Sequence, residues 1–166
     1  YPLQELFLTD KYLVNRGIRG YKTDLLDHHL DAHIFGQVVD KVFLLIGTND
    51  IGKEMPLSET IDHMTSILQE IARLLPLAQI KLLSVLPVNE GAIYKGTVYI
   101  RSNQKIQALN QAYRDLAGGM VNVEFIDVFD CLLGADGQLK PAYTTDGLHL
   151  TIEGYRVLSE RLRKEL

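Results

Sequence analysis

Short apolar runs alternate with amphipathic stretches along the chain, and this alternation constrains the fold more than any other feature. The apolar runs span residues 12–15, 42–46, 80–86 and 121–129. Strands that alternate with helices are typical of a parallel sheet covered by helices, so the sequence predicts an α/β fold. Residues 42–46 and 80–86 are apolar at nearly every position and predict central strands, whereas residues 121–129 begin with an apolar/polar alternation that predicts an edge strand.

The stretches between the strands predict helices that pack on the sheet. Apolar residues recur at steps of three and four in three ranges, 61–75, 106–116 and 152–162. Ser58 and Thr151 precede the first and the third range as expected N-caps, and a shorter helix is predicted over residues 25–34. Because the sequence contains no internal repeat and no Pro/Ser-rich linker, we expect a single domain over residues 1–166.

Composition and charge exclude several classes of partner. With 46% hydrophobic and 23% charged residues, the chain has the composition of a folded globular protein. Its net charge of -4 provides no basic surface for nucleic acid or an anionic membrane, which favours small or neutral substrates. The longest apolar run is far shorter than the ~20 residues of a membrane span. A single cysteine, Cys131, excludes an internal disulfide and favours a cytoplasmic location.

Polar residues at three places could carry chemistry. In open parallel sheets, ligands bind beyond the carboxyl ends of the strands, so the residues that follow each run are the first candidates. Residues 15–20 follow the first run, residues 47–50 follow the second, and residues 146–150 precede the last helix.

Asp146 and His149 are three residues apart in a loop that contains glycine. The carboxylate could accept a hydrogen bond from one imidazole nitrogen and leave the other nitrogen to act as a base, as in a hydrolytic triad. The alternative is that Asp146 is a turn residue and that His149 makes an ordinary contact at the start of a helix.

Asn49 and Gly20 could provide a different part of such a site. A developing oxyanion needs fixed hydrogen-bond donors, and a side-chain amide together with a glycine N–H would supply two. The alternative is that residues 48–50 cap a helix or a turn and that Gly20 serves only a left-handed turn.

These stretches, in this order, resemble the SGNH or GDSL hydrolase family of serine esterases and lipases, particularly its platelet-activating-factor-acetylhydrolase-like members. Residues 15–20 match the family's N-x-G-x-x-G block, residues 47–50 match G-x-N-D, and residues 146–149 match D-x-x-H. The resemblance implies a flavodoxin-like, three-layer α/β/α fold with a parallel sheet. It also implies hydrolysis of an ester of a small or lipid substrate through an acyl-enzyme, without a metal or an organic cofactor.

The resemblance assigns roles to five residues. Gly20, through its N–H, and Asn49, through its amide, are the implied oxyanion donors. His149 is the implied general base and Asp146 orients it. Asp50 is expected to brace the loop that holds Asn49.

The family's first block, G-D-S, has no counterpart in the 166 residues. That block ends the first strand and carries the nucleophilic serine. None of the serines present is expected to replace it, since each is predicted to lie in or beside a helix or within a strand: Ser58, Ser66, Ser84, Ser102 and Ser159. We therefore expect an N-terminally truncated chain, inactive alone, with the nucleophile upstream of Tyr1. The missing first strand would lie between residues 12–15 and 42–46.

Other residues suggest weaker hypotheses. His29 and His33 have the i, i+4 spacing of a helical metal pair, but a solvated helix face explains them more simply. Residues 17–20 could cradle a phosphate, which would make the chain a non-catalytic, flavodoxin-like binding module for nucleotides. Residues 94–99 could form a wall of the acyl site or serve only in surface packing. The sequence leaves the substrate and the oligomeric state open.

Overall fold

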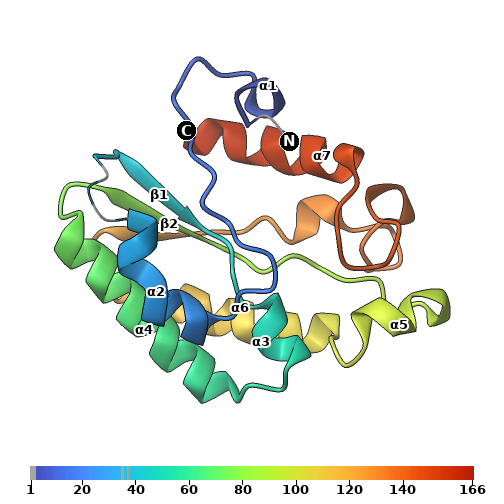
Figure 1. Cartoon of the computed structure of the whole chain (residues 1–166). Helices are drawn as coiled ribbons and strands as arrows, with labels where there is room; N and C mark the ends of the chain where they lie inside the picture. Colours follow the sequence, from blue (N-terminus) through green and yellow to red (C-terminus); the bar gives the residue numbers. More distant parts are fainter. Residues whose placement is uncertain (1–2, 35, 37) are drawn as a thin grey trace. The chain divides into compact units, whose positions relative to one another are not determined.

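The structure is a computed structural model that describes residues 3–34, 36 and 38–166 (Figure 1). Contacts divide the chain into two compact units, each built from discontinuous segments. The sheet unit contains Gly20–Val85 and Gln104–Asp127, and the C-terminal unit contains Tyr1–Arg19, Leu86–Asn103 and Val128–Leu166. The single domain over residues 1–166 stays a prediction.

The sheet unit contains a three-stranded parallel sheet in the order β1-β2-β3. Its strands are β1 (Lys41–Leu44), β2 (Gln79–Leu83) and β3 (Val123–Ile126). The register pairs Leu44 with Leu82 and Leu82 with Phe125. The parallel sheet and the α/β fold predicted from the sequence are confirmed.

The helices of the sheet unit lie on one side of its sheet (Figure 1). They are α2 (Thr23–Ile34), α4 (Leu57–Leu74) and α6 (Asn103–Gly118), with the short α3 (Thr48–Gly52) directly after β1. Because β1, β2 and β3 follow one another across the sheet, right-handed crossovers place both connecting helices, α4 and α6, on the same face. Their apolar stripes are buried as the periodicity predicts, with Met64, Ile71 and Tyr113 each 0% exposed.

The C-terminal unit contains α1 (Leu3–Phe7) beside α7 (Ile152–Leu162). Short helical turns occupy its loops: η1 (Ala92–Tyr94), α5 (Lys95–Val98), η2 (Asp130–Leu132), η3 (Pro141–Tyr143) and η4 (Arg163–Glu165). Thr151 is the N-cap of α7, as predicted, and accepts a hydrogen bond from the Gly154 N–H at 3.3 Å. Of the helices in the described ranges, none has the length and apolarity that crossing a bilayer requires.

Three details of the predicted architecture are wrong. Residues 12–15 form no strand, because a strand needs a ladder partner and the sheet of the described residues contains β1, β2 and β3 alone. Residues 42–46 were predicted as a central strand, but β1 pairs with β2 alone in this sheet and therefore lies at its edge. Ser58 is not an N-cap: α4 begins at Leu57 after Pro56, whose ψ of 140° is extended, so Ser58 lies inside the first turn.

Candidate functional site

Asp146 and His149 form a hydrogen-bonded pair in the loop before α7. The His149 Nδ1 lies 2.6 Å from Oδ2 of Asp146. The other carboxylate oxygen, Oδ1, accepts from the backbone N–H groups of Leu148 at 3.0 Å and His149 at 2.8 Å. Both oxygens are therefore fixed, while the His149 side chain remains 62% exposed. The structure brings these two predicted residues together in the order that a base and its orienter require.

The charge of Asp146 determines which nitrogen of His149 is free to act. Partial burial raises the pKa of Asp146, but hydrogen bonds from the His149 ring and from two backbone N–H groups outweigh it and lower the pKa to about 2. An ionised carboxylate only accepts hydrogen bonds, so the proton of the neutral imidazole resides on Nδ1. Nε2 is then left with its lone pair, as a general base requires.

This low pKa gives a prediction for the pH dependence. A carboxyl whose pKa is lower in the folded than in the unfolded chain stabilises the fold above its ordinary pKa of 3.8, and this contribution is lost as the pH falls toward 2. We expect the Asp146 carboxyl carbon to titrate near pH 2 by NMR. In His149→Ala its pKa should rise, because the ring hydrogen bond is lost. If Asp146 in the parent titrates at its ordinary pKa, the hydrogen bond between Asp146 and His149 is contradicted.

Gly147 lets the loop between Asp146 and His149 pack closely against the segment that contains Tyr94 and Val98. Gly147 has a φ of +82°, and a Cβ there would lie 2.6 Å from Cβ of Tyr94 and 2.9 Å from Cγ2 of Val98. Its carbonyl accepts from the Asn89 N–H at 2.8 Å. The turn formed by η1 and α5 thus packs directly against the loop of residues 146–149, which we call the dyad loop after the Asp146 and His149 pair. This is the segment predicted as a substrate wall, and that role stays a prediction.

Sequence reasoning missed two buried residues that support this loop. Asn89 is 6% exposed, donates to the Leu139 carbonyl at 2.8 Å and accepts from the Gly91 N–H at 3.0 Å. Thr144 is 3% exposed, and its hydroxyl accepts from the Gly147 N–H and donates to the His149 carbonyl. Each is an ordinary turn or loop residue in sequence, and only the fold reveals its partners.

In the sheet unit, Gly47 ends the apolar stretch of β1 and starts α3. Its φ is +134°, and a Cβ there would lie 2.8 Å from Cδ2 of Leu109 and 3.0 Å from Cγ2 of Val85. The Tyr113 hydroxyl donates to the Ile46 carbonyl at 3.1 Å, which fixes the turn from the α6 side. A glycine is therefore required for both backbone angle and space, and the turn carries Asn49 and Asp50 on the first residues of α3.

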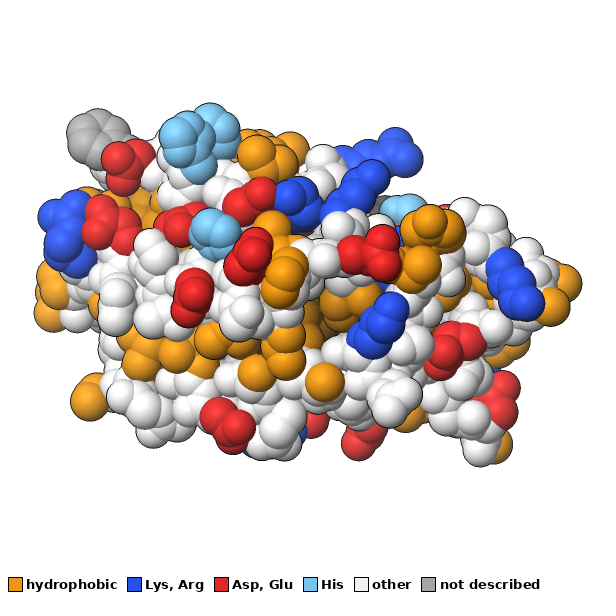
Figure 2. Space-filling view, turned by 90° about the horizontal axis from the view of Figure 1, so that it is seen from below, with side chains coloured by type: hydrophobic (Ala, Val, Ile, Leu, Met, Phe, Trp, Pro, Cys, Tyr) orange, Lys and Arg blue, Asp and Glu red, His pale blue; other side chains and the backbone are white. Residues whose placement is uncertain are grey.

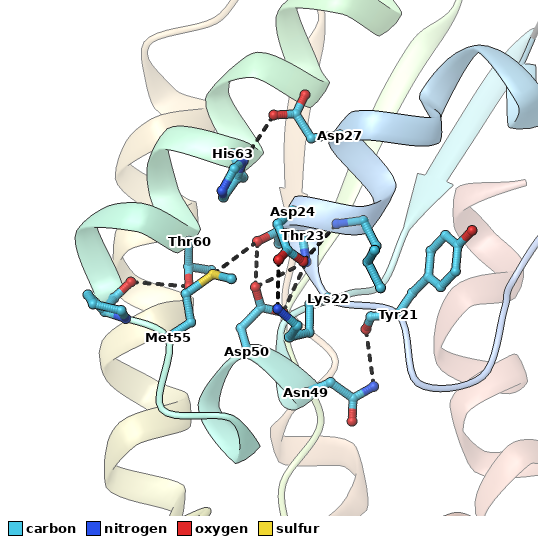
Figure 3. Close-up of polar contacts among 12 residues, drawn as sticks. Tyr21, Lys22, Thr23, Asp24, Asp27, Asn49, Asp50, Met55, Thr60 and His63 are labelled. Atoms are coloured by element: carbon cyan, nitrogen blue, oxygen red, sulfur yellow. Dashed lines mark hydrogen bonds and ion pairs between the residues drawn. The ribbon is translucent and has the colours of Figure 1, made fainter.

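Asn49 and Asp50 both hold the segment that follows Gly20 (Figure 3). The Asn49 amide donates to the Tyr21 carbonyl at 3.1 Å. Asp50 is 0% exposed and accepts from the Thr23 N–H at 3.0 Å and from the Thr23 hydroxyl. Burial raises the pKa of the Asp50 carboxyl, and the bonds from Thr23 oppose that shift. The predicted donors thus lie in one connected group, with Asn49 bonded to the residue next to Gly20.

Gly20 itself is exposed and has a φ of +82°. Within the described chain, nothing lies within 4 Å of the position a Cβ would take. The left-handed angle requires glycine here, whereas the space above it is open.

A second polar cluster lies between α2 and α4, where acidic and His side chains gather on the surface (Figure 2). His63 Nδ1 lies 3.0 Å from Asp27 Oδ2, and Ser66 donates to Asp27 Oδ1 at 2.7 Å. His29 has a non-helical φ of -109° in α2, which distorts its predicted spacing to His33. In the described part of the chain, no three His, Cys, Asp or Glu residues are placed to hold a metal ion.

Comparison with known proteins gives a family match over nearly the whole chain. The model of the GDSL-like lipase/acylhydrolase family matches residues 2–157. The GDSL esterase/lipase WDL1 of Oryza sativa subsp. japonica is 26% identical over 155 residues, which cover 78% of this chain and 59% of that protein. The N-acylneuraminate cytidylyltransferase of Escherichia coli O18:K1:H7 is 29% identical, over 93% of this chain and 35% of its own length. The chain thus spans less than two thirds of these relatives.

Solved structures show the same fold. A structure from Streptococcus pneumonia, provisionally named a platelet activating factor, is 60% identical with a TM-score of 0.96, over 99% of this chain and 77% of that one. A GDSL-like lipase from Bacteroides thetaiotaomicron is 24% identical with a TM-score of 0.77, over 97% of this chain and 78% of its own, and this likeness concerns the fold alone. With the family match, these findings show that the chain belongs to the GDSL-like lipase/acylhydrolase family.

Proposed function

We propose that the protein is a serine esterase that cleaves an ester of a small or lipid substrate through an acyl-enzyme. The observation that carries this proposal is the bond between the ionised Asp146 and Nδ1 of an exposed His149. Membership of the GDSL-like lipase/acylhydrolase family supports it. So does the rice relative, which is named an esterase/lipase.

In the proposed reaction, Nε2 of His149 takes the proton of a serine hydroxyl as its oxygen attacks the ester carbonyl. Asp146 holds the imidazole and stabilises its positive charge. The tetrahedral intermediate collapses, the bond between the acyl carbon and the alcohol oxygen breaks, and His149 gives its proton to that leaving oxygen. Water then attacks the acyl-enzyme with His149 again as base, which releases the acid and the serine.

Gly20 and Asn49 are proposed to donate hydrogen bonds to the oxyanion of that intermediate. Their arrangement supports this role, because the Asn49 amide is oriented by the carbonyl next to Gly20. Asp50 would hold the segment that follows Gly20 next to Asn49 through its bonds to Thr23. Preorganised donors of this kind stabilise the transition state without reorganisation during the reaction.

The nucleophile is proposed to lie upstream of Tyr1. Of the serines in the chain, Ser84 and Ser159 are buried at 0% and 1% exposure, which excludes substrate from both. Ser58 and Ser66 lie on α4, and Ser102 directly precedes α6. None ends a strand at an exposed turn, which is the position of the family's serine.

Replacement of an oxyanion donor tests this proposal. In the full-length protein, Asn49→Ala should lower kcat for p-nitrophenyl acetate by roughly 10² to 10³, because one donor to the transition state is lost. The loss of its bond to Tyr21 should cost about 1 kcal/mol of stability. Gln111→Ala is the matched control, since it removes an exposed amide from α6 and should leave kcat unchanged. Full activity of Asn49→Ala would overturn the assignment.

A further inference from the structure

We infer that Thr144 is a positioning residue for the Asp146 and His149 pair, because its hydroxyl bonds to the backbone on both sides of the turn that joins them. Its effect on catalysis rests on the proposed esterase function. Its effect on the geometry of the pair does not.

The Thr144 hydroxyl is used as both acceptor and donor. Oγ1 accepts from the Gly147 N–H at 2.9 Å and donates to the His149 carbonyl at 2.8 Å. Oγ1 also lies 3.5 Å from Oδ1 of Asp146, but a hydroxyl has a single proton and the His149 carbonyl is much closer. Since Thr144 is 3% exposed, water is poorly placed to replace these bonds.

Backbone pairing fixes the two ends of this loop but leaves its middle to side chains. Thr144 and Leu150 form an antiparallel bridge, and the Thr151 N–H donates to the Tyr143 carbonyl at 2.8 Å. Between these ends, the carboxylate of Asp146 and the hydroxyl of Thr144 bind the peptides of residues 147–149. Removal of the hydroxyl would leave the Gly147 N–H and the His149 carbonyl without this partner, so the peptide that carries the imidazole could turn.

The consequence for catalysis follows from how tightly the base must be placed. An error of about 1 Å in the position of a catalytic group can cost roughly 10² in rate. Valine has the shape of threonine without the hydroxyl, and serine keeps the hydroxyl without the methyl group. The two substitutions therefore separate the hydrogen bonds of Thr144 from its packing.

The experiment compares three variants of the full-length protein with the parent. We expect Thr144→Val to lower kcat for p-nitrophenyl acetate by roughly 10- to 100-fold with KM nearly unchanged, and Thr144→Ser to keep most of the activity. The control is Thr151→Val, which removes another hydroxyl from this segment, the N-cap of α7. It should lower the unfolding midpoint and leave kcat unchanged.

A second readout does not depend on activity. The Asp146 carboxyl should titrate near pH 2 in the parent and in Thr151→Val, and its pKa should rise toward 3.8 in Thr144→Val as the bonds from His149 and Leu148 weaken. If Thr144→Val does not fold, Thr144→Cys against Thr144→Ser replaces it, since a thiol is a weak donor and acceptor of similar size. A hydroxyl-free variant with parental kcat and an unmoved Asp146 pKa overturns the inference. A parent without esterase activity would overturn the proposed function instead, and the titration would still test Thr144.

Discussion

His149→Ala in the full-length protein should lower kcat for an ester substrate by roughly 10⁴ to 10⁶, and its only loss of stability should be the contribution of the ring hydrogen bond to Asp146. The reason is that His149 is the only proposed proton carrier in both halves of the reaction, and its side chain is 62% exposed, so the substitution leaves no buried cavity. Stopped-flow or steady-state hydrolysis of p-nitrophenyl acetate measures kcat. A fluorophosphonate probe should label a serine of the parent and fail to label the variant.

The chain offers a matched control in its second Asp/His pair. His63 contacts Asp27 with the same atoms, Nδ1 and Oδ2, at 3.0 Å. There, however, Ser66 bonds to the carboxylate rather than to the imidazole, which is the wrong order for a triad. His63→Ala should therefore keep full activity and labelling. Equal loss in both variants, or no loss in His149→Ala, would contradict the proposed role of His149. A nucleotide-binding module would show no labelling in any of them.

The parts of the fold that follow local periodicity were predictable from the sequence. The range 61–75 overlaps α4 and extends one residue beyond it, and the range 106–116 lies within α6. Their apolar stripes are buried because an amphipathic helix packs that face on a sheet. The predicted strand at 12–15 failed because strand formation depends on a partner, which local pattern does not supply.

The candidate site was predictable only where its residues form short motifs. Asp146 and His149 are close in sequence, so their spacing alone suggested the pair that the structure shows. Thr144 was missed, because a threonine beside a turn has many possible partners. The sequence also did not reveal why position 47 requires glycine. The side chains that exclude a Cβ there, Leu109 and Val85, are distant in sequence. Long-range packing is what the local pattern does not contain.

Gly147→Ala should be among the most damaging single changes near the dyad. Alanine at a φ of +82° costs about 1–3 kcal/mol in backbone strain. Its Cβ would also lie 2.6 Å from Cβ and 2.7 Å from Cγ of Tyr94, and overpacking of this kind costs a further ~1–3 kcal/mol. Because the Cβ of Tyr94 belongs to its own backbone geometry, no side-chain rotation relieves the contact. The loop must move, and kcat should fall together with the urea midpoint of the full-length protein.

Gly137→Ala separates the two causes of destabilisation, which are backbone strain and overpacking. Gly137 lies in the same unit with a φ of +74°, but among the described residues nothing is within 4 Å of the position its Cβ would take. This variant should therefore show only the backbone strain, about 1–3 kcal/mol as at Gly147, and keep the parental kcat. The difference in unfolding free energy between the two variants measures the cost of overpacking where Tyr94 approaches the dyad loop. Equal destabilisation with equal activity would mean that this approach is not needed to place His149.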